Sequence, residues 1–307
     1  MHFLSRREFL GSSAALALGS VALSKDPPAA PTPPPALHIN PATAAQMAND
    51  PFDGFAIGMQ SYTFRNFNLE QALVRTADLG LRHIELYNGH LPTNASDAQI
   101  EAAKNLMRQH HITPFAFGVE HFSNNDAANR RLFEFARKLG IRNLTADPDP
   151  NSFDSLDRLC EEFDINIAIH PHGPQGARLH RWYSAEVILD AVRSHNRRIG
   201  TCLDTGHLIH SAIAPFNRHL DPAQQVRAMG ARNFGIHLKD HNNMTERDVV
   251  FGRDGGVLNV LSVLQALRDV NFRGYISIEY EANAANPTPD VRACLDVLKE
   301  SVRQMNA

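Results

Sequence analysis

The sequence has little cysteine and no excess of charge of one sign. Its three cysteines, Cys160, Cys202 and Cys294, are too few and too scattered for a disulfide framework or a paired-cysteine zinc site. We interpret each as a small buried apolar residue. Lysine and arginine total 30 against 33 aspartates and glutamates, which gives a net charge of -3. Nucleic-acid binding therefore has no electrostatic support, and no nucleic-acid partner is expected.

Large aromatic residues and long apolar runs are also scarce. Trp182 is the one tryptophan and there are five tyrosines, so a non-catalytic sugar-binding protein would have few aromatic stacking platforms. The apolar stretch near the N-terminus is too short to span a bilayer comfortably, so we expect no stable membrane anchor.

The N-terminal segment 5–24, "SRREFLGSSAALALGSVALS", is similar to a twin-arginine export signal. Arg6 and Arg7 are followed by Phe9 and Leu10 and then by the apolar stretch. We expect residues 1–24 to be a signal peptide that uses the twin-arginine export machinery, and the mature protein to be periplasmic or secreted. Residues 25–51 are rich in proline and alanine and predict a semi-rigid linker.

From residue 54 onward, short apolar runs alternate with segments of helical periodicity. The predicted strands are 55–62, 82–87, 112–119, 142–147, 165–170, 199–204, 233–238 and 274–280. The predicted helices are 69–79, 98–111, 127–139, 154–163, 185–194, 222–229, 257–270 and 289–305. Asn68 suits the N-cap of the first helix and Gly80 suits the position just after its end.

Strands that alternate with helices are typical of parallel sheets. Eight such units in roughly 250 residues fit a single (β/α)8 barrel, predicted here for residues 52–307. The competing doubly wound sheet usually has a glycine-rich phosphate loop after its first strand, and "GMQSYTFRNFN" is nothing like one.

Several of the predicted strands end in polar side chains that can bind a metal. The chemistry of such barrels lies at the C-terminal ends of the strands. The fifth strand ends in His170 and His172, the sixth in "LDTGH", the seventh in "IHLKDH" and the eighth in "IEYE". Unpaired charges in one apolar mouth are costly unless they pair or hold a metal. Imidazoles mixed with carboxylates, without thiolates, favour Mn, Co, Fe or Zn over Ca and argue against a structural zinc site.

At "CLDTGH", "HLKDH", "ISIEYE" and "VFGRDGGVLNVLSVLQAL" the sequence resembles the xylose isomerase-like TIM-barrel superfamily, in its sugar phosphate isomerase/epimerase branch. The resemblance covers about residues 54–305. It implies one divalent ion, with Mn first and Co, Zn, Fe or Mg as alternatives, and a small carbohydrate as substrate. The implied metal ligands are His170, Asp204, His237 and Glu279.

The resemblance also implies roles around the metal. His207 and His172 would contact substrate hydroxyl groups and, with Glu279, transfer protons. Lys239 would be an electrophile or proton donor, or else simply an ion-pair partner of Asp240 or Glu281. The implied pocket-lining residues are Gln60 and Glu85. From the sequence itself, Arg253 in "FGRDGG" either binds an anionic group or is a surface residue.

One position departs from the family pattern. Ketose epimerases of this fold carry glutamates as ligands on both the fifth and the eighth strands, and these two carboxylates remove and return the proton next to the carbonyl. Here the fifth strand supplies His170, and a metal-bound neutral imidazole cannot act as that base.

We therefore expect a metal-dependent isomerase or epimerase of a small sugar or keto sugar. A lyase or dehydratase of oxidised sugars is the close alternative. A metal-dependent hydrolase and a non-catalytic sugar-binding protein are the others, and the protein could form a homo-oligomer.

Overall fold

The computed structural model describes residues 50–307. The predicted signal peptide and all but the end of the predicted linker lie outside these residues and stay predictions. Among residues 50–307, no helix combines the length and the apolar character needed to cross a membrane.

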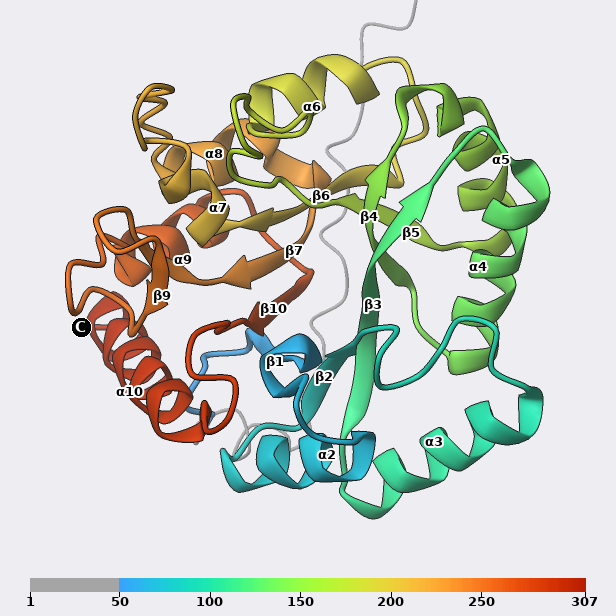
Figure 1. The fold of residues 1–307 in the computed structure, drawn as a ribbon, viewed down its shortest axis with the longest axis horizontal. Coiled ribbons are helices and arrows are strands. Elements are labelled where there is room, and N and C mark those ends of the chain that lie inside the picture. Colours follow the sequence, from blue (N-terminus) through green and yellow to red (C-terminus); the bar gives the residue numbers. More distant parts are fainter. Residues whose placement is uncertain (1–49) are drawn as a thin grey trace, which may run out of the picture. The chain divides into compact units, whose positions relative to one another are not determined.

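Eight parallel strands close into a barrel in the order β1, β10, β7, β6, β5, β4, β3, β2 (Figure 1). These strands are β1 (Ala56–Gln60), β2 (His83–Leu86), β3 (Thr113–Phe122), β4 (Asn143–Pro148), β5 (Asn166–Ile169), β6 (Ile199–Asp204), β7 (Asn233–Leu238) and β10 (Tyr275–Ile278). The pairing of β1 with β10 joins the first strand to the last. The predicted single (β/α)8 barrel is confirmed.

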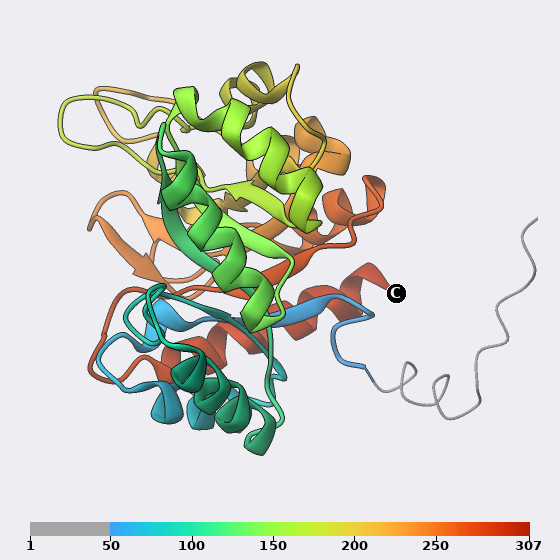
Figure 2. The same cartoon turned by 90° about the vertical axis from the view of Figure 1, so that its right-hand side faces the viewer.

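Helices follow the strands and surround the barrel (Figures 1 and 2). They are α2 (Leu69–Asp78), α3 (Asp97–Gln109), α4 (Asp126–Leu139), α5 (Phe153–Phe163), α6 (Ala185–Val192), α7 (Thr205–His210), α8 (Pro222–Met229), α9 (Val260–Asp269) and α10 (Thr288–Met305). Three short 3-10 turns, Ser61–Phe64, Pro150–Ser152 and Gly230–Arg232, complete the helical segments of residues 50–307.

The ends of α2 follow the local sequence. The Asn68 side chain accepts the backbone N–H of Gln71, and the Gln71 side chain accepts the N–H of Asn68, which makes a reciprocal capping box. Gly80 has a φ of 81° just beyond the helix, a left-handed conformation that glycine adopts without a steric cost. Both predicted ends of this helix are confirmed.

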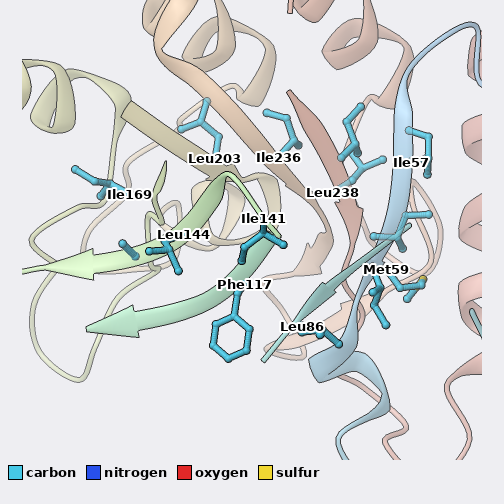
Figure 3. Packing of buried hydrophobic residues seen from close by; sticks show 14 of the residues in the cluster. Ile57, Met59, Leu86, Phe117, Ile141, Leu144, Ile169, Leu203, Ile236 and Leu238 are labelled. Carbon is cyan, nitrogen blue, oxygen red and sulfur yellow. The ribbon is translucent and has the colours of Figure 1, made fainter. Parts of the chain in front are cut away.

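The hydrophobic core lies mainly between the strands and the helices. Outward-facing strand residues such as Leu144, Ile169, Leu203 and Ile236 are fully buried there (Figure 3). A smaller group inside the barrel consists of Ala116, Ala168, Cys202 and Tyr275. Side chains on alternate positions therefore serve the two sides of the barrel wall, and the polar ones that point inward gather at its C-terminal end.

Two elements near the C-terminal end were not predicted from the sequence. The six-residue helix α7 follows β6 directly, with Asp204 as its N-cap. A hairpin of β8 (Asp240–Asn242) and β9 (Arg247–Val249) follows β7. Both are too short and too polar for a periodic apolar pattern, so the sequence reads as loop at these places.

Candidate metal and substrate site

His170, Asp204, His237 and Glu279 come together at the C-terminal end of the barrel. Each offers one ligand atom, and these atoms all lie within 4.8 Å of one another. All four residues are buried. The strand register explains the meeting, because Asp204 is the Cα partner of His237 and His237 is the partner of Ser277, two residues before Glu279.

The ligand atoms are His170 Nε2, Asp204 Oδ2, His237 Nδ1 and Glu279 Oε2. His170 Nε2 lies 3.0 Å from His237 Nδ1 and 3.3 Å from Asp204 Oδ2. His237 Nδ1 lies 3.2 Å from Glu279 Oε2 and 3.9 Å from Asp204 Oδ2. Two imidazole nitrogens and two carboxylate oxygens form the donor set that Mn, Co, Fe and Zn accept.

The surroundings of Asp204 Oδ2 indicate whether a cation fits among the four ligand atoms. Asp204 Oδ2 is fully buried and accepts no hydrogen bond, although it lies 3.2 Å from Lys239 Nζ. The other carboxylate oxygen, Oδ1, accepts the backbone N–H of His207 at 2.7 Å. A buried carboxylate oxygen without a hydrogen bond costs free energy, and a cation among the four ligand atoms would remove that cost. The residues present therefore fit a divalent metal ion.

Glu85 lies below the ligand group and is fully buried. Its Oε2 accepts a hydrogen bond from His237 Nε2 at 2.8 Å and another from Ser277 Oγ at 2.6 Å, while Oε1 accepts one from Thr145 Oγ1. A carboxylate that accepts from Nε2 leaves Nδ1 of the same ring to face the ligand group. Glu85 was predicted to line the substrate pocket; the structure instead places it where it positions His237.

Lys239 reaches the group from the side. Its ammonium lies 3.0 Å from Glu279 Oε2 and 2.6 Å from Glu281 Oε1, besides its contact with Asp204. Burial would lower the pKa of Lys239, but the carboxylates of Asp204, Glu279 and Glu281 raise it well above its usual value. Lys239 is thus a fixed cation beside the group. Of the two ion-pair partners predicted from the sequence, Glu281 contacts Lys239, whereas no ion pair joins Lys239 to Asp240 among residues 50–307.

His172 and His207 flank His170, with ring centroids 4.7 Å and 5.5 Å from that of His170. The pKa of His172 is lowered to about 4, mainly by burial and secondly by the neighbouring His180. Burial also holds the pKa of His207 well below its ordinary value. Both imidazoles are therefore neutral at pH 7, and each has a nitrogen lone pair that can accept a proton or a hydroxyl hydrogen.

Gln60 and Arg253, the other two residues predicted to contact the substrate, are not members of the four-residue ligand group. Gln60 is buried at the end of β1, where its side chain accepts the N–H of Tyr62 and its amide donates to Gly118 O at 3.4 Å. Arg253 is exposed and lines a surface pocket together with Asp296 and Glu300 of α10. The structure does not bring Arg253 to the ligand group.

A second cluster near the mouth consists of Asp147, His172 and His180. His180 Nδ1 accepts the backbone N–H of Trp182, so neutral His180 carries its hydrogen on Nε2, which lies 3.5 Å from Asp147 Oδ2. Arg181 Nε is 3.7 Å from the other Asp147 oxygen. A ring nitrogen that carries hydrogen cannot bind a metal, so we interpret this cluster as hydrogen-bonded.

The structure adds residues that the sequence did not indicate. Thr145, Ser277 and Tyr275 point into the barrel below the ligand group, and Thr145 Oγ1 lies 2.7 Å from the Tyr275 hydroxyl. Thr145 and Ser277 stand within strands and Tyr275 begins β10, so none of the three stands at the C-terminal end of a strand. The only available signal was a polar residue in an otherwise apolar strand.

With this geometry in place, the relationship to known proteins is clear. A family model described as "Xylose isomerase-like TIM barrel" matches residues 73–301, and the chain belongs to this family. No match was found among curated proteins.

Solved structures of similar fold include an uncharacterised protein from Parabacteroides distasonis, with 25% identity, a TM-score of 0.61 and coverage of 80% of this chain and 98% of that one. A D-tagatose 3-epimerase-like protein has 19% identity, a TM-score of 0.65 and coverage of 82% and 98%. The 3-keto-D-glucoside 4-epimerase from E. coli has 14% identity, a TM-score of 0.60 and coverage of 80% and 99%. At these identities the likeness shows the fold.

Proposed function

We propose that the protein is a divalent-metal-dependent isomerase or epimerase of a small sugar or keto sugar. The observation that carries the proposal is the four-residue group at the barrel mouth, in which one buried carboxylate oxygen accepts no hydrogen bond. Membership of the family and structural neighbours named as sugar epimerases support the same reaction class. Manganese is the first metal we propose.

His170, Asp204, His237 and Glu279 would hold the ion. Bound there, a divalent metal supplies Lewis-acid polarisation of a carbonyl oxygen. The rest of the chemistry falls to the protein's own groups, which must remove and return a proton at the neighbouring carbon.

Proton-transfer groups lie on two sides of the site. On the β10 side, burial would raise the pKa of Glu279, but Lys239 and then His237 lower it well below its usual value, so this carboxylate is ionised. On the β5 and β6 side stand the neutral imidazoles of His172 and His207. A carboxylate facing imidazoles can replace the two glutamates of ketose epimerases, while Lys239 offers an ammonium hydrogen to a developing negative charge.

One observation favours a lyase or dehydratase as the second candidate. The strand-five ligand is His170, so Glu279 is the one carboxylate of the ligand group besides Asp204. Elimination needs one well-placed base. Product analysis of a keto sugar incubated with the metal-loaded protein separates the two reactions, since only elimination gives an unsaturated product.

We also propose that the protein is exported by the twin-arginine pathway and acts in the periplasm or outside the cell, on the basis of Arg6, Arg7 and the apolar stretch that follows. Secretion of a reporter fused to residues 1–24, and its loss when both arginines become lysine, would test this.

The metal assignment is tested by elemental analysis of the purified protein and its variants, followed by a ketose screen. We expect about one equivalent of metal. Asp204→Ala and His170→Ala should lose metal and activity together, whereas Glu279→Gln should lose activity with a milder loss of metal. Asp147→Ala, at another strand end, is the matched control and should keep its metal. Full metal occupancy in Asp204→Ala would make the ligand assignment wrong.

A further inference from the structure

A pocket of about 440 Å³ lies beside the ligand group, on the side of α7 and the β8–β9 hairpin. We call it the hairpin pocket. Its lining includes His207, Lys239, Glu246, Arg247, Asp248 and Glu281. Lys239, which lines this pocket, lies 3.0 Å from Glu279 of the ligand group, so the hairpin pocket adjoins that group.

The hairpin wall is tied to its neighbours on both sides. Asp248 Oδ2 accepts the backbone N–H of Glu281 after β10 at 2.8 Å, and Asp248 Oδ1 lies 3.3 Å from His241 Nδ1. Asn243 Nδ2 donates to Ile209 O on α7 at 2.9 Å. A wall fixed by such contacts is preorganised, so its charges keep their places when a ligand enters.

Carboxylates outnumber cations in this pocket. Glu246, Asp248 and Glu281 face Lys239 and Arg247. Lys239 is already surrounded by Asp204 and Glu279 as well as by Glu281. A phosphate group here would meet a net negative wall.

The nearby glycine-rich loop, residues 251–258, does not provide a phosphate-binding site either. The backbone N–H groups of Gly252, Val257 and Leu258 all donate to the Asp240 carboxylate, at 2.7, 3.1 and 3.2 Å. Phosphate-binding loops work by leaving such N–H groups free for the ligand. Here one buried aspartate occupies them.

We propose that the hairpin pocket binds the unreactive end of the substrate as an uncharged polyhydroxy group, so that the substrate is an unphosphorylated sugar or glycoside. This rests on the proposed function. Hydroxyl groups both donate and accept hydrogen bonds, which suits a lining of imidazoles, carboxylates and an amide.

The test compares matched pairs of ketoses with the metal-loaded mature protein. Calorimetry at low salt would give the Kd for D-fructose and D-fructose 6-phosphate, and for D-tagatose and D-tagatose 6-phosphate. We expect the uncharged member of at least one pair to bind at least tenfold more tightly. Glu246→Lys should reduce this ratio, because it replaces a carboxylate of the pocket with a cation and so strengthens binding of the phosphorylated member. Glu246 is exposed at the hairpin turn. Glu101→Lys, with the same charge change on α3, should leave the ratio unchanged.

The outcomes separate the two proposals. Equal or tighter binding of the phosphorylated member, lost in Asp204→Ala, would overturn the assignment of the hairpin pocket and leave the sugar-metal site intact. An unchanged ratio in Glu246→Lys would also overturn the assignment. Failure of every member of both pairs to bind the metal-loaded protein would count against the pocket assignment and the proposed function together.

Discussion

A single carboxylate on β2 determines which nitrogen of His237 faces the ligand group. Glu85 can only accept hydrogen bonds in its ionised form, so the His237 nitrogen 2.8 Å away must carry hydrogen. That nitrogen is Nε2, and Nδ1 is therefore the one that meets His170, Asp204 and Glu279. Carboxylates behind metal-binding histidines fix the ring and strengthen its basicity.

Replacing this carboxylate should weaken metal binding without removing a ligand. In Glu85→Gln the side chain keeps its length but loses its charge, so His237 loses its fixed orientation and some of its basicity. We expect the Kd for Mn²⁺ or Co²⁺, measured by calorimetry, to rise by roughly 10- to 100-fold. The ligand-field spectrum of the Co²⁺ form should also change.

Ser277→Ala is the matched control for Glu85→Gln. It removes a different hydrogen bond to the same Glu85 oxygen but leaves the contact with His237 intact. Its effect on metal affinity should be clearly smaller. If Glu85→Gln binds metal as tightly as the unchanged protein, the positioning role of Glu85 is wrong.

The sequence indicates single residues best where they follow an apolar run. His170, Asp204, His237 and Glu279 each stand at or near the end of a predicted strand, and the structure brings all four together. The role of Glu85 could not be predicted in the same way. It depends on Ser277 and His237, which lie far along the chain and reach Glu85 only when the barrel closes.

At the scale of elements, Asp240, the first residue of β8, joins this strand to the loop that precedes α9. Its buried carboxylate accepts N–H groups from Gly252, Val257, Leu258 and also His241. Asp240→Ala would leave these donors unpaired, so we expect the free energy of unfolding in urea to fall by at least about 3 kcal/mol. Asp240→Asn, which keeps one acceptor oxygen, should lose less.

Hydrogen exchange locates the effect of these variants. The amides of Gly252, Val257 and Leu258 should exchange faster in Asp240→Ala, whereas those of α3 should change only through the global loss of stability. Asp296→Ala, an exposed aspartate on α10, serves as the control. Unchanged exchange in the loop would contradict the role of Asp240.

The end of β3 carries a carboxyl group whose protonation couples to folding. Burial raises the pKa of Glu120 to about 7, from an ordinary value of 4.5. The folded protein therefore binds this proton more tightly than the unfolded chain does, and stability should decline as the pH rises from about 4.5 to 7. Glu120→Gln removes this loss, so at pH 8 the variant should be more stable by roughly 2 kcal/mol and at pH 4 nearly equal.

Urea unfolding at the two pH values measures the Glu120 effect, with Glu101→Gln on the exposed face of α3 as control. If Glu120→Gln and the unchanged protein differ in free energy of unfolding by the same amount at pH 4 and pH 8, the Glu120 side chain acts through packing and not through its charge.

The elements that the sequence predicted are those with periodicity. All eight barrel strands and their principal helices appear within a few residues of the predicted bounds. The hairpin and α7 were missed because three- and six-residue elements carry no period. Their positions are set by long-range contacts, such as that of Asn243 with Ile209 O, and these elements form the wall of the hairpin pocket.

At the scale of the whole molecule, the closed barrel makes the metal site a sum of distant segments. The ligands come from residues 170 to 279, and Glu85 comes from β2. No fragment of the barrel holds them all, so the site exists only in the folded state. A ligand that binds only the folded state stabilises it by mass action.

Metal addition should therefore raise the thermal stability of the entire barrel. At a free metal concentration of 100 times the Kd, the gain is roughly 2.7 kcal/mol, which for a chain of this size raises the Tm by roughly 5 °C. His170→Ala should abolish this gain. Asp204→Ala should abolish it too, and its metal-free form should be less stable by about 1 kcal/mol because Asp204 also caps α7. Differential scanning calorimetry with and without a chelator measures both effects. If metal still raises the Tm of both His170→Ala and Asp204→Ala, the metal binds elsewhere in the protein. The chemistry proposed for the barrel mouth would then have to be assigned to that other site.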